Sequence, residues 1–391
     1  MMNHAGEQEF PVIRMVDNLL ASAITRAASD IHFEPTADQL RIRLRIDGVL
    51  YDHEAVDASI MQQLLSRLKV LANINIAEKR IPQDGKFRIL SNGHEIDLRV
   101  STFPALHGEK IVVRILDRAD HAITLDNLGF SPQMAATFKE LISKANGFFL
   151  VSGPTGSGKT TTLYAALSSL NNPQKNIITL EDPVEYCVPG VTQGQIHPDA
   201  GFTFEKGIRA LLRQDPDIVM VGEIRDIQTA GIAIEAALTG HLVFSTVHTN
   251  DAPSVVMRLM DMGIEPFLIN AAITGVLAQR LARKICQSCK IEKAPNDQEA
   301  AILKKYNCEF KTLYSGAGCQ NCLGLGYKGR VGIFELLVMT SSLRSLIVQH
   351  PSFDDIYRQA RSDGMQSLTH DGLAKVEQGI ISLPELLRVV L

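Results

Sequence analysis

The spacing of hydrophobic residues changes along the chain from an alternating helix-and-strand pattern to continuous apolar runs. Near the N-terminus, apolar residues fall at helical spacing over residues 13–24 and again over residues 61–71, which predicts two amphipathic helices. Between them, residues 40–46 alternate strictly between aliphatic side chains and arginines, and Asp47-Gly48 follows as a turn signal. This combination predicts an α+β domain whose sheet has one buried and one polar face.

A hairpin in the same region fixes which side chains share a face. The Asn-Gly pair at residues 92–93 predicts a two-residue turn, which places Ile89 opposite Ile96 on the apolar face. The same register opposes a basic and an acidic residue on the other face. Counting onward places Arg99 on this polar face, and the alternation of the next strand places Arg114 there too.

A second kind of pattern begins after a turn-prone, charged linker at residues 118–126. Short apolar runs alternate with helical segments, which is typical of a parallel sheet with both faces covered. The runs are residues 148–152, 176–180, 218–221 and 242–246. We therefore expect one domain over residues 1–117 and an α/β domain over residues 127–391, which ends in helices over residues 340–391.

The composition is ordinary for a globular protein and limits the classes of partner. Of the 391 residues, 45% are hydrophobic and 21% are charged, and the formal net charge is −4. A protein that binds nucleic acid phosphates is usually basic, so we expect no nucleic-acid partner. No run reaches the ~18 apolar residues of a membrane span, and the polar N-terminus has no signal-peptide core. We expect a cytoplasmic protein that reaches a membrane only through partners.

The clearest candidate for chemistry follows the run at residues 148–152. The sequence there matches G-x-x-x-x-G-K-[ST] between a predicted strand and a predicted helix, which is the context of a P-loop. The motif consists of Gly153, Pro154, Thr155, Gly156, Ser157, Gly158, Lys159 and Thr160. In such a loop, backbone N–H groups and the lysine bind the phosphates of ATP, and the threonine hydroxyl binds Mg²⁺.

Two acidic residues and a histidine near the ends of later strands are candidates for catalysis. Glu185, Glu223 and His248 each follow one of the predicted strands. The carboxyl ends of parallel strands converge on a bound nucleotide, where a carboxylate can orient or deprotonate the attacking water. We favour that role for Glu223, whereas Glu185 could be a solvated loop acid and His248 a structural residue or a γ-phosphate contact. No Asp ends the strand before Gly222, so a direct Asp ligand for magnesium is missing.

Four of the six cysteines form two C-x-x-C pairs, Cys286/Cys289 and Cys319/Cys322. Two such pairs describe a closed tetrahedral zinc site, although the gap between them exceeds that of the usual zinc ribbon. A closed site has no position for substrate, so we expect Zn²⁺ to be structural, in an insertion at residues 284–325. The alternative is four unliganded thiols. Redox chemistry is not favoured, since neither pair opens a helix after a thioredoxin-like strand.

Together these motifs resemble the type II secretion and type IV pilus-assembly ATPases over nearly the whole chain. Besides the sites above, the similarity covers residues 29–35, 80–85, 98–102, 108–110, 222–226, 239–241, 279–281 and 326–330. The resemblance implies a RecA-like core, a PAS-like N-terminal domain and six subunits in a ring. It further implies that Glu223 is the catalytic carboxylate, with Glu185 and His248 near the γ-phosphate. Arg99 and Arg114 match the arginines that reach the nucleotide from the first domain.

The resemblance also implies where such a motor works. Motors of this family act at the inner membrane with a platform protein and a membrane-anchored docking protein. The four-cysteine site resembles that of assembly and secretion members, so we expect ATP hydrolysis that drives a type II secretion pseudopilus or a type IV pilus. Members of this branch usually carry a further N-terminal docking region, and we expect a form that lacks it.

Other functions are compatible with some of the residues. A pilus retraction motor of the same superfamily shares the nucleotide site. A P-loop nucleotide kinase with a zinc-stapled lid would place its P-loop near the start of the chain, whereas here a complete domain precedes it. The acidic balance opposes a RecA-like protein that binds nucleic acid. The retained Glu223 and Arg99 oppose a nucleotide-gated scaffold without turnover.

Overall fold

The computed structural model describes residues 11–91, 93–117 and 124–390. The chain divides into two compact units, Met1–Ala122 and Ile123–Leu391, and each has its own main sheet. Much of the linker predicted at residues 118–126 lies outside the described residues. Among the helices that are described, none is long and apolar enough to cross a bilayer.

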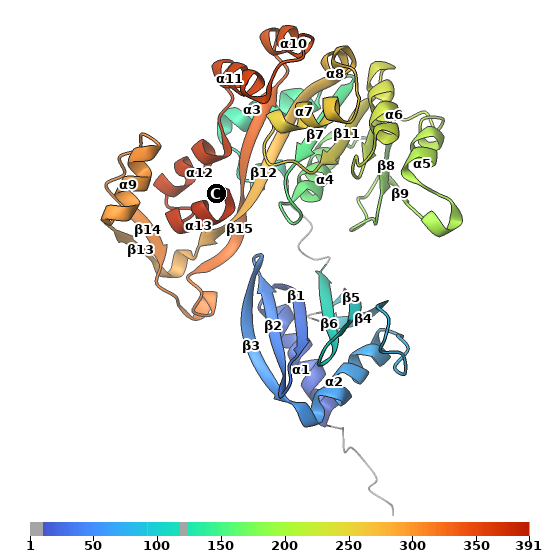
Figure 1. Ribbon diagram of the computed structural model, residues 1–391, viewed down its shortest axis with the longest axis vertical. Helices are drawn as coiled ribbons and strands as arrows, with labels where there is room; N and C mark the ends of the chain where they lie inside the picture. Colours follow the sequence, from blue (N-terminus) through green and yellow to red (C-terminus); the bar gives the residue numbers. More distant parts are fainter. Residues whose placement is uncertain (1–10, 92, 118–123, 391) are drawn as a thin grey trace, which may run out of the picture. The chain divides into compact units, whose positions relative to one another are not determined.

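The first unit is a six-stranded antiparallel sheet in the order β3-β2-β1-β6-β5-β4, with two helices on one face (Figure 1). Its elements are α1 (Pro11–Thr25), β1 (Ala28–Pro35), β2 (Gln39–Ile46), β3 (Val49–Asp57), α2 (Ala58–Leu71), β4 (Gln83–Ser91), β5 (His94–Ala105) and β6 (Gly108–Asp117). Leu40, Ile42 and Leu44 of β2 are fully buried, as the alternation predicts. The predicted hairpin is confirmed, since Ile89 of β4 lies opposite Ile96 of β5.

The second unit is built on a seven-stranded sheet in the order β15-β12-β7-β11-β10-β8-β9. Every neighbouring pair is parallel except β12 with β15. The strands are β7 (Gly147–Ser152), β8 (Ile177–Glu181), β9 (Thr192–Gln195), β10 (Ile218–Val221), β11 (Leu242–Val247), β12 (Ile273–Ile285) and β15 (Tyr327–Val338). The helices that alternate with them are α3 (Pro132–Ile142), α4 (Lys159–Leu170), α5 (Phe204–Leu211), α6 (Ile227–Leu238), α7 (Pro253–Asp261) and α8 (Pro266–Ala272).

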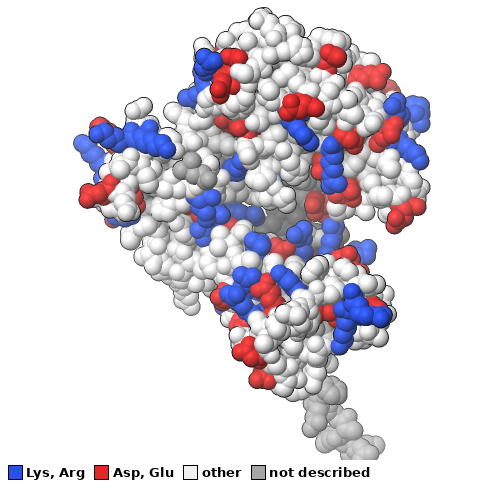
Figure 2. Space-filling model, in the orientation of Figure 1, with Lys and Arg blue, Asp and Glu red and all other residues white. Residues whose placement is uncertain are grey.

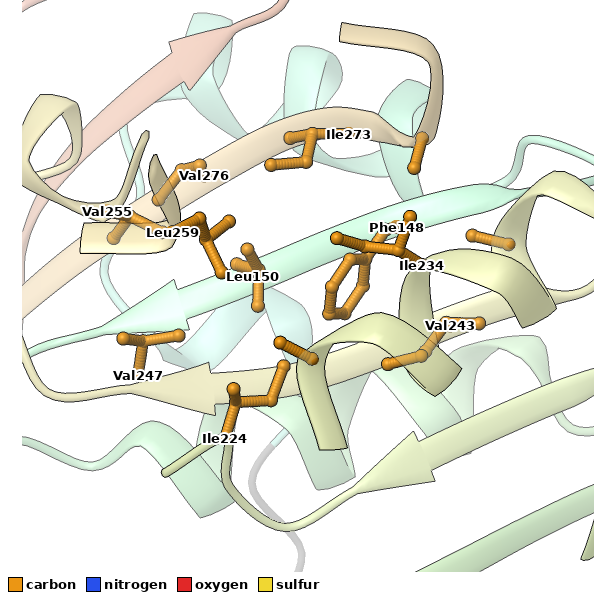
Figure 3. Packing of buried hydrophobic residues seen from close by; sticks show 14 of the residues in the cluster. Phe148, Leu150, Ile224, Ile234, Val243, Val247, Val255, Leu259, Ile273 and Val276 are labelled. Carbon is orange, nitrogen blue, oxygen red and sulfur yellow. The ribbon is translucent and has the colours of Figure 1, made fainter. Parts of the chain in front are cut away.

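Both faces of the central strand β7 are buried, which explains its continuous apolar run. Phe148 and Leu150 point into a cluster that includes Val276 of β12 (Figure 3). Phe149 and Val151 belong to a separate cluster. Because successive side chains of a strand point to opposite faces, the two clusters cover the two faces of the sheet. The predicted α/β class is confirmed.

The sequence pattern did not reveal the two long strands β12 and β15. The apolar stretch at residues 267–278 spans two elements, because Pro266 begins the short helix α8 and the chain becomes extended at Ile273. A continuous apolar run has neither the helical nor the strand period, so nothing in the pattern marks the junction. β12 and β15 pair along most of their length and form one edge of the sheet.

The cysteine pairs lie where β12 ends and where β15 begins. Between them are β13 (Lys290–Lys293), α9 (Asp297–Lys305) and β14 (Leu313–Gly316), and β13 and β14 form a small antiparallel sheet of their own. The predicted C-terminal helices are confirmed as α10 (Ser341–Ile347), α11 (Phe353–Ser362), α12 (Leu368–Glu377) and α13 (Leu383–Val390). Leu303 of α9 shares a buried cluster with Leu373 and Leu386, so the insertion packs on these helices.

Candidate nucleotide-binding and catalytic site

The predicted P-loop connects β7 to α4, as the sequence requires of such a motif. Gly153, Gly156 and Gly158 have φ angles of 145°, 78° and 86°, values that glycine adopts without strain. A Cβ on Gly153 would lie 2.5 Å from the carbonyl oxygen of Gln279, so the loop passes directly against β12. The loop tip at residues 154–156 is exposed while Ser157 is buried.

Lys159 is the first residue of α4, and its side chain reaches back over the loop. Its Nζ donates hydrogen bonds to the carbonyl oxygens of Gly153 (2.8 Å) and Pro154 (3.2 Å). Burial lowers the pKa of Lys159 to about 8, while Glu223 raises it and Arg280 lowers it further. Among the described residues, no carboxylate lies within ion-pair distance of Nζ. A desolvated cation at the N-terminus of a helix, without its own anion, fits the binding of phosphate.

Glu223 lies on the segment that follows β10, and both neighbours of that residue are bonded to Thr246 of the adjacent strand β11. The Thr246 hydroxyl donates to the carbonyl of Gly222 at 2.7 Å, and the Ile224 N–H donates to the carbonyl of Thr246 at 2.9 Å. The Glu223 side chain is only 16% exposed and forms an ion pair with Arg225. β10, β11 and β7 are parallel neighbours, so Glu223 leaves the sheet at the same end as the P-loop, and its charge raises the pKa of Lys159.

His248 completes this group from the end of β11. Its Nε2 lies 3.6 Å from Oε2 of Glu223. Burial lowers the pKa of His248 below its usual 6.5, Lys159 lowers it further, and Glu223 raises it. The imidazole is therefore mostly neutral at pH 7 and can either donate or accept a hydrogen bond. The structure thus brings together Lys159, Glu223 and His248, which the sequence singled out from three separate strands.

The acidic cluster at residues 181–185 separates into two environments. Glu181, at the end of β8, is buried and accepts hydrogen bonds from Tyr164, Thr179 and Gln193. Tyr164 lies on α4 and Gln193 on β9, so the Glu181 carboxylate connects β8 to both elements and has a structural role. Glu185 is exposed on the loop beyond β8. Of the two carboxylates, only Glu185 is accessible to a ligand.

Two residues of β12 support the site, although sequence reasoning gave them no role. Gln279 is 1% exposed; its amide nitrogen donates to the carbonyl of Ser157 (2.7 Å) and its oxygen accepts from Thr162 (2.9 Å). Arg280 donates a hydrogen bond to the carbonyl of Asn250 at 2.8 Å, and Asn250 lies in the loop that follows His248. The available signal was a pair of polar residues inside an apolar strand, since a buried polar side chain requires partners.

The two candidate arginines belong to the other unit. Arg99 of β5 and Arg114 of β6 lie directly opposite each other. Arg114 is exposed and donates to Asp30 of β1 at 2.9 Å. Within the described part of the chain, Arg99 has no carboxylate partner. The predicted placement of both arginines on the polar face of the sheet is confirmed by the register, and their role stays a prediction.

The four cysteines come together as the sequence predicts. The Sγ–Sγ distances are 3.9 Å for Cys286–Cys319, 3.8 Å for Cys289–Cys322 and 3.7 Å for Cys319–Cys322. A tetrahedral metal with metal–sulfur bonds of about 2.3 Å separates its sulfurs by about 3.8 Å. Cys322 Sγ also accepts N–H groups from Cys319 and Gly326, each at 3.2 Å. The residues therefore fit a closed, four-thiolate metal site.

Comparisons with known proteins agree with this fold and with the family resemblance. Residues 5–388 match the family model described as type II/IV secretion system protein. The type IV pilus assembly ATPase PilB of Thermus thermophilus is 48% identical over 96% of this chain, which spans 42% of that relative's length. The type II secretion system protein E of Pseudomonas aeruginosa is 47% identical over 98% of this chain and 76% of its own length.

The solved structures give the same answer for the fold. The pilus retraction motor PilT, determined with bound ADP, is 26% identical and superposes with a TM-score of 0.62, over 95% of each chain. The expectation of a RecA-like fold and the resemblance drawn from the sequence are both confirmed. The family match favours this reading over the nucleotide kinase. A P-loop, a carboxylate and a histidine lie at the carboxyl ends of neighbouring strands, and four cysteines cluster beyond them. With these features and relatives of this kind, the chain belongs to the type II/IV secretion system protein family.

Proposed function

We propose that this chain hydrolyses ATP to drive assembly of a type IV pilus or of a type II secretion pseudopilus. The observation that carries the proposal is the proximity of Glu223 to both the P-loop lysine and His248, with His248 Nε2 at 3.6 Å. A phosphate-binding loop alone would fit any nucleotide-binding protein. A carboxylate held beside that loop adds the group needed to activate water, which favours hydrolysis.

Each residue of the site has a proposed role in this reaction. The P-loop amides and Lys159 hold the β- and γ-phosphates, and Thr160 with the phosphates and water would hold Mg²⁺, which neutralises developing charge when bound. Glu223 orients or deprotonates the attacking water. His248 donates a hydrogen bond toward the γ-phosphate, and the exposed Glu185 contributes a second carboxylate near it.

Arg99 and Arg114 are proposed to complete the nucleotide site of a neighbouring subunit in a homo-hexamer. Both sit on the polar face of the first unit's sheet, where the guanidinium of Arg99 is not committed to any described carboxylate. An arginine from another subunit can stabilise the charge of the transition state, so hydrolysis would depend on assembly. ATP would then close these interfaces and hydrolysis would reopen them, and the ring would pass the motion to an inner-membrane platform protein.

The remaining features of the proposal concern location and the metal. The protein is proposed to be cytoplasmic and peripheral to the inner membrane, held there by a membrane-anchored docking protein. Zn²⁺ is proposed for the four-cysteine site because four thiolates in a closed tetrahedron favour this ion. A retraction motor is the second candidate, since PilT shares the fold at 26% identity. Measurement of pilus assembly and of retraction in cells lacking this chain distinguishes the two.

The test of the proposal is the ATPase rate of two inactive variants mixed together. Arg99→Ala and Glu223→Gln should each lack turnover and keep nucleotide binding. In a mixture, an Arg99→Ala subunit supplies an intact Glu223 and its Glu223→Gln neighbour supplies an intact Arg99. Random assembly of equal amounts should therefore restore about a quarter of the sites.

Two controls make this experiment decisive. The wild-type rate per subunit should rise steeply with protein concentration and then saturate, because sites are completed between subunits. A double variant carrying both substitutions, mixed with an equal amount of wild type, should leave about a quarter of all sites intact, which is half the number that unmixed wild type would supply. Absence of recovery in the mixture, with both variants correctly folded and assembled, would refute the shared site. Absence of ATP turnover by the wild-type assembly would refute the proposed function itself.

A further inference from the structure

The loop that carries His248 is tied at two points to the long strands at the edge of the sheet. It runs from the end of β11 to Pro253, the first residue of α7. Arg280 of β12 donates to the carbonyl of Asn250 at 2.8 Å. The N–H of Ala252 donates to Oε1 of Glu335, on β15, also at 2.8 Å. These two bonds hold the backbone of the loop immediately after His248.

Glu335 is a buried carboxylate, and burial disfavours its charged form. It is 2% exposed, and Ala252 is fully buried. Burial and the charge of Asp251 raise the pKa of Glu335 to about 6. The N–H groups of Ala252 and Leu368 and the charge of Arg361 act in the opposite direction. Removing this carboxylate would leave the buried Ala252 N–H without its acceptor, so Glu335 also stabilises the fold. A test of any further role must therefore separate a loss of activity from a loss of stability.

Apart from the bond from the Ser254 N–H to Oδ1 of Asp251 (2.8 Å), the rest of α7 is held mainly by apolar contacts, which lack direction. Val255 and Leu259 pack against Leu150 and Val276 in the large hydrophobic cluster (Figure 3). Hydrophobic packing holds the axis of a helix near the sheet but is tolerant of small rotations and shifts. A hydrogen bond to the N-terminus of the helix is directional and sets the place where the preceding loop leaves it.

We propose that Glu335 is a positioning residue for His248: its carboxylate holds the Ala252 N–H and so fixes the loop that aims the imidazole at Glu223. This inference rests on the proposed function, because it assigns Glu335 a part in the same hydrolytic site. Arg280 acts on the same loop from β12, through the carbonyl of Asn250. The loop is thus held by a donor and an acceptor from adjacent, hydrogen-bonded strands.

The same carboxylate links the site to the C-terminal helices. Leu368, whose N–H lowers the pKa of Glu335, is the first residue of α12. α12 is anchored to β15 a second time, because Asp371 accepts the N–H of Phe334 at 2.9 Å and pairs with the buried Lys375. A displacement of α12 would therefore be felt at Glu335 and, through Ala252, at the loop that carries His248.

The experiment compares Glu335→Met, Glu335→Gln and a control in the full chain, assembled as for the wild type. Glu335→Met removes the acceptor and keeps the volume. We expect kcat to fall on the order of tenfold or more, because small displacements of a reacting group are costly. KM and the nucleotide Kd should stay within about twofold, since the P-loop is untouched. Glu335→Gln keeps an oxygen that can accept from Ala252, and most of kcat should return.

A second readout does not depend on activity. Hydrogen–deuterium exchange of the peptide covering residues 248–256 should be faster in Glu335→Met, with no change in the peptide covering residues 153–162. The matched control is Glu385→Gln. Glu385 is another buried carboxylate, which accepts from Arg283 of β12 and contacts no residue of the His248 loop. The control should lower thermal stability without changing exchange at residues 248–256.

Two outcomes would overturn the inference. One is a Glu335→Met protein with the wild-type kcat and the wild-type exchange rate at residues 248–256. The other is an equal loss of kcat in Glu335→Met and in the Glu385→Gln control, since that loss would reflect stability alone. If the wild type shows no turnover, the proposed function fails, and faster exchange at residues 248–256 in Glu335→Met still decides whether Glu335 holds the loop.

Discussion

Substitution of Cys322 by serine should weaken metal binding by the four-cysteine site and loosen the insertion around it. Cys322 is the buried member of the second pair, and its sulfur lies 3.8 Å from that of Cys289 and 3.7 Å from that of Cys319. Both distances match the ~3.8 Å expected around a metal with bonds of about 2.3 Å. The four sulfurs are therefore already placed for one ion.

The size of the effect follows from the contacts of that sulfur. Cys322 Sγ is one of four ligands and also accepts two backbone N–H groups. Loss of outer-shell contacts alone weakens metal sites about 10–100-fold, so loss of the ligand should cost at least about 3 kcal/mol of binding free energy. Because metal binding of about 10–16 kcal/mol is coupled to folding in such sites, part of that loss appears as local unfolding.

The assay measures zinc per chain and thermal stability together. The wild type should contain one zinc ion per chain, released by a strong chelator with a fall in the unfolding midpoint. Cys322→Ser should contain less than one, start from a lower midpoint and respond little to the chelator. Cys308→Ser is the matched control, because Cys308 lies in the same insertion, is half-buried and stands outside the metal cluster. It should retain full zinc content.

Two results would refute this reasoning. One is a Cys322→Ser protein with one zinc ion per chain and an unchanged unfolding midpoint. The other is a wild-type protein, purified without chelator, in which all four clustered thiols react freely and no zinc is released. Either would mean that the sulfur geometry reflects packing of thiols and not a metal site.

Three further predictions concern the nucleotide site. Glu223→Gln should lower kcat by roughly 10²–10⁴ while nucleotide affinity stays within a few-fold, measured by turnover and by fluorescent nucleotide titration; an unchanged kcat would remove Glu223 as the water-activating group. In the free protein Lys159 has a pKa of about 8, and bound phosphate favours its charged form, so nucleotide affinity should be flat below pH 8 and fall above it. Calorimetry near pH 9 should show proton uptake on binding, which Lys159→Arg should abolish; a flat affinity across this range would contradict the assignment. Gly153→Ala should cost on the order of 1–3 kcal/mol of stability or nucleotide binding, because its φ is 145° and the new Cβ would lie 2.5 Å from the Gln279 carbonyl oxygen.

The sequence was most informative where the pattern was local. The Asn-Gly turn predicted that Ile89 faces Ile96, and the register confirms it. The P-loop could be identified because its glycines, Lys159 and Thr160 are contiguous. The two cysteine pairs predicted their cluster, because two knuckles of fixed spacing have few ways to satisfy a metal. In each case the interactions lie within a few residues or follow a known geometric template.

Sequence reasoning failed where a residue's role depends on distant neighbours. β12 and β15 were not recognised, because an apolar stretch buried on both sides has no helical or strand period. Gln279 received no role, since its partners Ser157 and Thr162 are more than a hundred positions away. Within the acidic cluster, nothing in the sequence showed that Glu181 is buried by Tyr164 and Gln193 while Glu185 stays exposed.

By itself, then, the sequence determined the class of the core, the P-loop motif, the four-cysteine cluster and the family resemblance. Only the tertiary structure placed Glu223 at the P-loop and beside His248, and connected that loop through Arg280 and Glu335 to the edge strands. The physical reason is that turns, caps and metal knuckles are specified by short-range sterics and hydrogen bonds. The placement and burial of a side chain depend on which strands pair, and that pairing is decided by packing of the whole sheet.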